Sequence, residues 1–252
     1  MDKLVPSFQQ AVLDVFDGAV IYIGGFGGPG GMPHFLIDAL YDLGSSKLTL
    51  ISNTAGISMA AGFGAIEGRR LIDHSILIEK GMVKKVIASF PVAGNPRRVT
   101  AFEEAYRQKT VDLEMVPQGT LAERIRSAGS GIPAFYTPTG VGTFIENGKE
   151  VRRFGEREYL LEYALHADFA FVRAWKGDRN GNLIYRGSSQ NFNALMAMAA
   201  NVTIAEVDNF VELGDLSAEA IHTPSLFVDR IVKRPEDDSK VSIDAYVKST
   251  EQ

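Results

Sequence analysis

A dense cluster of glycines follows the first apolar run of this chain. Residues 19–23, Ala-Val-Ile-Tyr-Ile, suit a buried strand, and residues 24–31 read Gly-Gly-Phe-Gly-Gly-Pro-Gly-Gly. Glycine costs roughly 0.5–1 kcal/mol relative to alanine in regular structure, so the cluster indicates a loop that bends sharply or approaches a ligand closely. Pro33 suits the first position of a helix, and Gly44 suits its left-handed cap. The pattern therefore predicts a strand, a glycine loop and a helix in succession.

Short apolar runs alternate with amphipathic segments along much of the remaining chain. We predict further strands over residues 47–52, 83–89, 111–116, 167–174 and 202–207, and helices over 99–108, 121–128, 156–165 and 192–199. This repetition predicts an α/β fold, an open and mainly parallel sheet with flanking helices. Ligands of such sheets bind beyond the carboxyl ends of the strands, where the glycine loop and Asn53 fall.

The middle of the chain has a different pattern. Residues 143–154 hold two short runs around Asn147-Gly148, which predicts a β-hairpin, and the Asp-Arg-Asn-Gly of 178–181 predicts a turn before a strand at 182–185. We interpret both as antiparallel hairpin excursions on a single domain, residues 1–233, followed by a polar C-terminal tail, 234–252. Charged residues at 156–158 and Glu162 are expected on a solvated helix face.

Charge and composition exclude several classes of function. The chain carries 26 basic and 31 acidic residues and no cysteine. A net charge of −5 argues against a general nucleic-acid or anionic-membrane surface. The N-terminus lacks the apolar run of a signal peptide, and no stretch approaches a membrane span of about 18 apolar residues, so we expect a cytoplasmic protein. The four histidines, His34, His74, His166 and His222, form no i, i+4 pair, so no metal site is expected.

Backbone N–H groups of the glycine loop could hold an anion at the start of the helix. Residues 25–30 fit the G-x-G-x-x-G pattern of dinucleotide sites, but that reading requires an acidic residue at the end of the second strand. The second strand ends in Ser52-Asn53-Thr54, which disfavours nicotinamide binding. No Gly-Lys-Ser/Thr follows the loop, so a Walker-type phosphate site is excluded.

Asp17-Gly18, the apolar run, the glycines from Gly24 and the proline at Pro33 together resemble the signature of family I coenzyme A transferases. More specifically, they resemble the A (alpha) subunit of the two-subunit 3-oxoacid type. Further similar motifs follow in the expected order, at residues 51–56, 117–126, 131–143, 157–162, 174–176, 181–183, 186–193, 203–207 and 221–224. The resemblance spans roughly residues 10–233.

The resemblance implies transfer of coenzyme A from an acyl-CoA to a free carboxylate by a ping-pong route, as in ketone-body or short-chain fatty acid metabolism. A glutamate attacks the thioester, and a glutamyl-CoA thioester persists while the acids exchange. In this family that glutamate belongs to a partner B (beta) subunit, in a Glu-Asn-Gly segment, within an α2β2 heterotetramer. Glu146-Asn147-Gly148 is the near match here and is better interpreted as a turn; Glu79 and Glu114 are interpreted as further stray carboxylates.

By this resemblance the chain supplies no catalytic residue and needs no cofactor, with the coenzyme A thioester as substrate. Its expected contribution is substrate binding and support of the developing oxyanion. The predicted site residues are Gly24, Gly25, Phe26, Gly27, Gly28, Gly30, Gly31, Asn53, Thr54 and Gln118.

Three departures from the family pattern leave alternatives open. The loop has one extra residue before Pro33, Thr54 replaces the second asparagine of an Asn-Asn pair, and residues 90–98 differ. One alternative is a hydrolase of the same fold that acts on a cyclic acyl-CoA. Another is a binding module for a dinucleotide or coenzyme A.

Overall fold

The main sheet is parallel at its centre and carries the predicted strands. The computed structural model describes residues 2–26, 30–56, 69–92 and 99–244. The strand order is β12-β11-β9-β1-β2-β4-β5, all parallel, with the short β10 antiparallel on β9. The strands are β1 Val20–Ile23, β2 Leu48–Thr54, β4 Val83–Phe90, β5 Asp112–Met115, β9 Ala167–Asp178, β10 Leu183–Ile184, β11 Ala200–Val211 and β12 Arg230–Lys233. The predicted α/β fold is confirmed.

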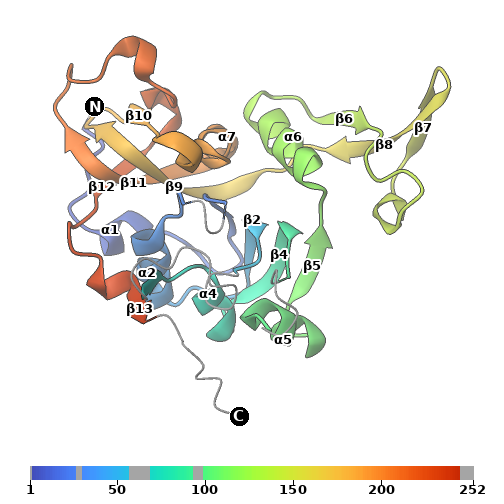
Figure 1. Cartoon of the computed structure of the whole chain (residues 1–252), viewed down its shortest axis with the longest axis horizontal. Helices are drawn as coiled ribbons and strands as arrows, with labels where there is room; N and C mark the ends of the chain where they lie inside the picture. The colour runs from blue at the N-terminus through green and yellow to red at the C-terminus, as the bar shows by residue number, and fades with distance from the viewer. Residues whose placement is uncertain (1, 27–29, 57–68, 93–98, 245–252) are drawn as a thin grey trace.

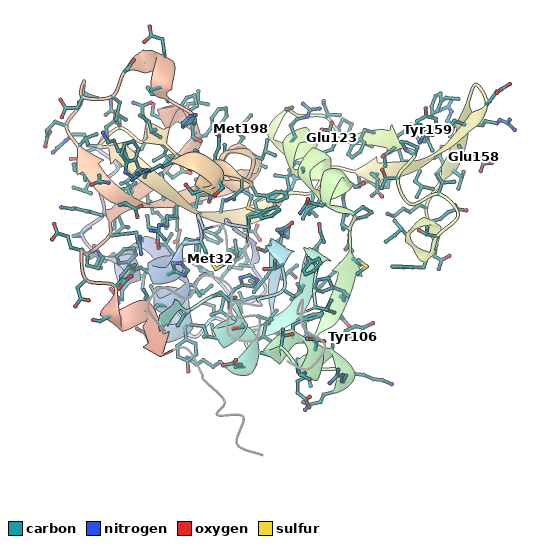
Figure 2. The ribbon with its side chains drawn as sticks, in the orientation of Figure 1. Met32, Tyr106, Glu123, Glu158, Tyr159 and Met198 are labelled. Atoms are coloured by element: carbon teal, nitrogen blue, oxygen red, sulfur yellow. The ribbon has the colours of Figure 1, made fainter. Side chains whose placement is uncertain are left out.

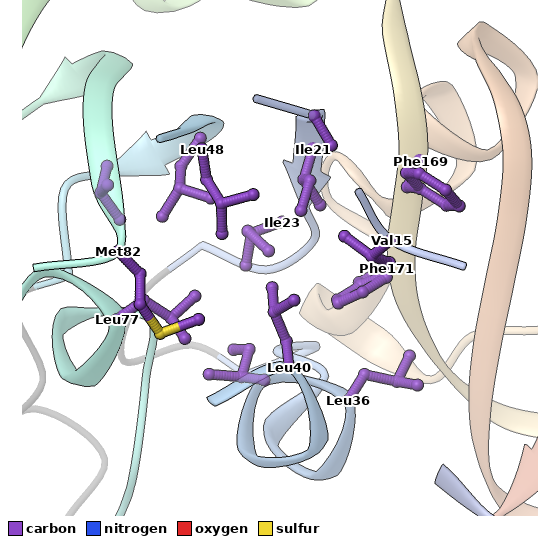
Figure 3. Close-up of a cluster of buried hydrophobic side chains, with 14 of the residues drawn as sticks. Val15, Ile21, Ile23, Leu36, Leu40, Leu48, Leu77, Met82, Phe169 and Phe171 are labelled. Atoms are coloured by element: carbon purple, nitrogen blue, oxygen red, sulfur yellow. The ribbon is translucent and has the colours of Figure 1, made fainter. Parts of the chain in front are cut away.

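Helices cover both faces of this sheet (Figure 1). They are α1 Phe8–Val12, α2 His34–Leu43, α4 Ser75–Glu79, α5 Ala101–Arg107, α6 Gln118–Gly129 and α7 Asn193–Ala199, with short 3-10 turns at Phe144–Glu146, Gly187–Gln190, Ala218–Ala220, Ser225–Phe227 and Ser239–Val241. Ile21 and Ile23 pack with α2 (Figure 3), whereas Tyr22 between them packs on the side of α6 and α7. This alternation is the period of a strand buried on both faces. In the described part of the chain, no helix has the length and apolarity needed to cross a membrane.

Helix α2 begins and ends close to the predicted residues. Gly44 closes it with φ 82°, and its N–H donates to the carbonyl of Leu40. Pro33 precedes the first helical residue, His34, and supplies no side-chain cap. The first turn of α2 therefore needs its hydrogen-bond acceptors from elsewhere in the fold.

An antiparallel arm, residues 134–163, projects from the main sheet (Figure 1). Its strands are β6 Ala134–Thr137, β7 Val151–Phe154 and β8 Arg157–Tyr163, in the order β6-β8-β7. The helix predicted over 156–165 is wrong, because those residues form β8. The predicted hairpin is also displaced, since Phe154 pairs with Arg157 around a turn at Gly155, and residues 144–146 form a 3-10 turn.

Strand β8 has a period of 2 that its charged residues conceal. Leu160 and Glu162 are buried, whereas Tyr163 is exposed, and Glu158 and Tyr159 lie toward the far end of the arm (Figure 2). We predicted that Glu162 lies on a solvated face, and this prediction is wrong. It pairs with Lys149, and its second oxygen lies 3.9 Å from Nε of Arg124.

Part of the predicted C-terminal tail packs against the domain. Val241 is fully buried beside Phe35 and Ile72. The next residues form β13, Ser242–Asp244, which pairs antiparallel with β3, Arg69–Leu71. The chain thus contributes to the fold up to residue 244.

Candidate functional site

Two predicted site residues meet at the carboxyl edge of the sheet. Asn53 lies at the end of β2, just before its last residue, and Gln118 opens helix α6 shortly after β5. Nε2 of Gln118 donates a 2.7 Å hydrogen bond to Oδ1 of Asn53. Asn53 is buried and Gln118 is exposed. The bond leaves the amide N–H₂ of Asn53 and, on Gln118, the amide oxygen and the second N–H of Nε2 as the remaining polar groups of the pair.

Thr54, the next predicted residue, is buried with its hydroxyl unbonded. Its carbonyl accepts a 2.9 Å hydrogen bond from Nε2 of His74. Within the described ranges, Oγ1 of Thr54, Nδ1 of His74 and Oγ of Ser75 are all buried without a hydrogen-bond partner. Buried polar atoms are nearly always bonded, so this concentration beside Asn53 is unusual.

The described part of the glycine loop has two distinct ends; Gly27 and Gly28 lie outside the described residues. At the first end, the N–H of Gly24 donates to the carbonyl of Phe171 over 2.9 Å. Gly24 therefore cannot supply the free backbone donor that we predicted. Its glycine is required by packing, because a Cβ there would lie 2.0 Å from Oδ1 of Asn193.

At the second end, backbone conformation and anchoring explain the glycines. Gly30 and Gly31 have φ of 98° and 79°, a region that favours glycine, as does the φ of 109° at Gly25 at the first end. Nδ2 of Asn191 donates to the carbonyl of Gly30 over 3.2 Å, and Nδ2 of Asn193 donates to that of Gly31 over 2.9 Å. The loop is thus fixed against residues 191–193.

Phe26 stands between these two ends. Its half-buried ring stacks on Phe192, with ring centroids 6.2 Å apart and an interplanar angle of 14°. The residue after the loop, Met32, is buried in the interior (Figure 2). Asn191 and Asn193 were not among the predicted site residues, although both lie in the motif at 186–193 that carried the resemblance.

The register of β1 against β2 places the loop and Asn53 at one edge. Tyr22 pairs with Ile51 in parallel, so both strands end on the same side of the sheet. Carboxyl ends of neighbouring parallel strands are where ligands of this architecture bind. The arrangement offers neutral amides, hydroxyls and backbone groups, which can bind carbonyl or carboxylate oxygens without adding charge.

Two of the three stray carboxylates, Glu114 and Glu146, are engaged in other contacts. Glu114 bonds to Lys85 and, over 2.8 Å, to Arg124. Burial alone would raise the pKa of Glu114, but these two cations outweigh it and hold the pKa below its usual value. Glu146 accepts the N–H of Gly142 over 2.7 Å within the arm, and Glu79 is exposed at the end of α4. Among the residues that the structure describes, no three His, Asp or Glu side chains are grouped to hold a metal ion.

Comparison with known proteins gives one consistent result. The sequence model of the family described as Coenzyme A transferase matches residues 5–234. The chain is 48% identical to the A subunit of the 3-oxoadipate CoA-transferase of Pseudomonas putida, over 92% of this chain and 94% of that one. It is 41% identical to the A subunit of the succinyl-CoA:3-ketoacid coenzyme A transferase of Helicobacter pylori, over 92% and 93% of the two chains.

Solved structures agree on the fold. The acyl-CoA transferase YdiF of Escherichia coli O157:H7 superposes with a TM-score of 0.78 at 23% identity. The match covers 94% of this chain but only 50% of the YdiF chain. This chain thus spans half the length of that relative.

Proposed function

The chain belongs to the coenzyme A transferase family, and we propose that it is the A subunit of a two-subunit enzyme that moves coenzyme A between an acyl-CoA and a free carboxylic acid. The observation that carries this proposal is the meeting of Asn53 with Gln118 at the sheet edge where the glycine loop emerges. Amide side chains and backbone N–H groups can bind and polarise a thioester or carboxylate oxygen, and none of them is a nucleophile.

In the proposed division of labour, this chain binds and orients the substrates, and the partner subunit supplies the group that attacks the thioester. The nucleophilic glutamate lies on the B subunit and forms the acyl–glutamyl anhydride and then the glutamyl-CoA thioester. Asn53, Thr54 and Gln118 hold substrate oxygens, and the backbone N–H groups of Gly25, Phe26, Gly30 and Gly31 are the proposed donors to the oxygen that becomes negative. Each well-placed donor of this kind contributes roughly 3–4 kcal/mol to transition-state stabilisation. We propose an α2β2 assembly.

The names of the relatives guide the choice of substrates. The Pseudomonas putida protein is named for 3-oxoadipate, and the Helicobacter pylori protein for succinyl-CoA and a 3-ketoacid. We infer a short-chain 3-oxo acid as acceptor and succinyl-CoA as donor. The 3-oxo acid carries a carboxylate and a ketone carbonyl, and succinyl-CoA carries a carboxylate and a thioester carbonyl. Neutral amide donors can bind all of these oxygens.

The test is reconstitution with a B subunit that carries the Glu-Asn-Gly segment. We expect no transfer by this chain alone and transfer by the complex that requires the acceptor acid. Borohydride reduction of the complex treated with acyl-CoA should modify a glutamate of the partner. Transfer by this chain alone, or label in this chain, would overturn the division of labour. Thioester cleavage that needs no acceptor would instead favour the hydrolase.

A further inference from the structure

A buried carboxylate on the central sheet caps the helix that follows the glycine loop. Glu206 lies in β11 and is completely buried. Its Oε2 accepts the backbone N–H of Phe35 over 3.0 Å and that of Leu36 over 3.1 Å. These are first-turn amides of α2, for which Pro33 provides no side-chain acceptor. Glu206 thus takes the place of a local N-cap from 170 residues along the chain.

The other oxygen of Glu206 faces a group of charged side chains. Nε of Arg234 lies 3.0 Å from Oε1, although the two are not aligned for a hydrogen bond. Asp208 bonds to Arg234 over 2.6 Å and to Arg173 over 3.0 Å, so it holds both arginines in place. His34, the first residue of α2, is buried nearby, and burial lowers its pKa to about 3, so it adds no charge at neutral pH.

The position of Glu206 matters because α2 begins shortly after the glycine loop ends. Gly31 is held by Asn193, and Phe35 follows only four residues later. The entry of the loop is held by the bond from Gly24 to Phe171. The contacts with Asn191, Asn193 and Glu206 are therefore the contacts, among the residues that the structure describes, that hold the second end of the loop and the helix that follows it.

We propose that Glu206 is a positioning residue: by holding the first turn of α2, it sets the distance of the glycine loop from the substrate. The role of the loop in catalysis rests on the proposed function, but the contact between Glu206 and α2 does not. Displacing catalytic groups by about 1 Å costs on the order of a hundredfold in rate, so a loosened α2 should lower turnover.

Two variants and a matched control test this role. Glu206→Gln keeps the volume, but its N–H₂ must face either the α2 amides or Arg234, all of which are donors. Glu206→Asp keeps the carboxyl group and shortens its reach by one methylene. Asp208→Asn disturbs the same arginines without touching α2. Hydrogen–deuterium exchange of the peptide spanning residues 24–36 reads out the loop directly.

We expect this peptide to exchange about tenfold faster in both Glu206 variants and unchanged in Asp208→Asn, the loss of the acceptor for these buried amides being worth about that factor. In the reconstituted complex, kcat should fall about ten- to a hundredfold while the KM for acyl-CoA changes less than about threefold. Equal exchange in wild type and both variants overturns the proposal, as does an equal loss of kcat in the control. Should the wild-type complex transfer nothing, the proposed function fails, while the exchange comparison still decides the role of Glu206.

Discussion

Gln118 donates its amide hydrogen to Oδ1 of Asn53 over 2.7 Å and so joins the start of α6 to the end of β2. The two residues are 65 positions apart in sequence. The bond fixes which atoms of each amide remain for a substrate. We therefore expect the two side chains to act together. The effect of substituting both should differ from the sum of the effects of the two single substitutions.

Gln118→Ala should lower kcat/KM about tenfold, because it removes one binding group and frees the other to rotate. Stability should fall by only about 1 kcal/mol, since Gln118 is exposed. Steady-state kinetics of the reconstituted complex measure the first effect and urea denaturation the second. Gln108→Ala, which removes an exposed glutamine bonded only within α5 and its cap, should leave kcat/KM unchanged. Equal kinetics for the two variants would contradict a role for the pair.

Gly24→Ala should destabilise the chain by about 1–3 kcal/mol, the usual cost of overpacking. The new Cβ would lie 2.0 Å from Oδ1 of Asn193, which accepts the N–H of Arg173 and cannot move away without losing it. Urea denaturation measures the change. Gly119→Ala serves as the control: it lies in α6 with nothing within 4 Å of its added methyl. It should stabilise the chain by about 0.5–1 kcal/mol.

Glu162→Gln should destabilise the chain by about 1.5–3 kcal/mol, because it leaves Lys149 without its buried counter-charge, whereas Arg124 keeps its ion pair with Glu114. Glu158→Gln, on the same strand but exposed, should change the free energy of unfolding by less than about 0.5 kcal/mol. Denaturation in urea at fixed salt compares the two. Similar values would show that the Glu162 ion pairs do not hold the arm.

Glu206 and His34 should make opposite contributions to the pH dependence of the free energy of unfolding. Burial raises the pKa of Glu206 from 4.5 to about 7, against the attraction of Arg234 and Arg173. The stability that the bound proton contributes is therefore lost as the pH rises from 4.5 to about 7. Burial lowers the pKa of His34 from 6.5 to about 3, so the folded state loses stability as pH falls below 6.5. Between pH 4.5 and 6.5 the two slopes should cancel.

In Glu206→Gln only the histidine slope remains. The free energy of unfolding should then fall by about 2–3 kcal/mol between pH 6.5 and 4.5, at 1.36 kcal/mol per pH unit for one proton. Urea denaturation across that range checks this. Parallel curves for wild type and variant would show that Glu206 does not titrate there.

The local pattern of apolar and polar residues was sufficient to predict the parallel sheet. It also predicted that the glycine loop and Asn53 lie at the same edge of that sheet. Apolar runs such as that ending at Ile23, with caps such as Gly44, specify elements whose burial on both faces leaves few other arrangements. Asn53 and Gln118 were named from the family resemblance, and the structure brings them together because Asn53 lies at the end of one strand and Gln118 opens the helix after another. Their direct bond could not be predicted, because it depends on how α6 is angled over β2.

The failures have physical causes. Residues 156–165 carry charges at a helical spacing, yet Glu162 is buried against cations from other segments, and no local signal shows that. Asn193 and Glu206 act on the loop through contacts more than 160 residues away. Such contacts arise from tertiary packing and not from periodicity. Gly24 resembled a ligand-binding glycine because packing against Asn193 demands the same absence of a side chain.

The position of β1 at the centre of the sheet has a consequence for biosynthesis. One neighbour, β2, follows within the next few dozen residues, but Ile21 pairs on its other side with Phe169. Asn193 and Glu206, which shape the glycine loop, emerge from the ribosome later still. During synthesis β1 therefore waits with one flank unpaired until residues 169–171 have emerged, and the loop takes its working shape only after residue 206 has emerged.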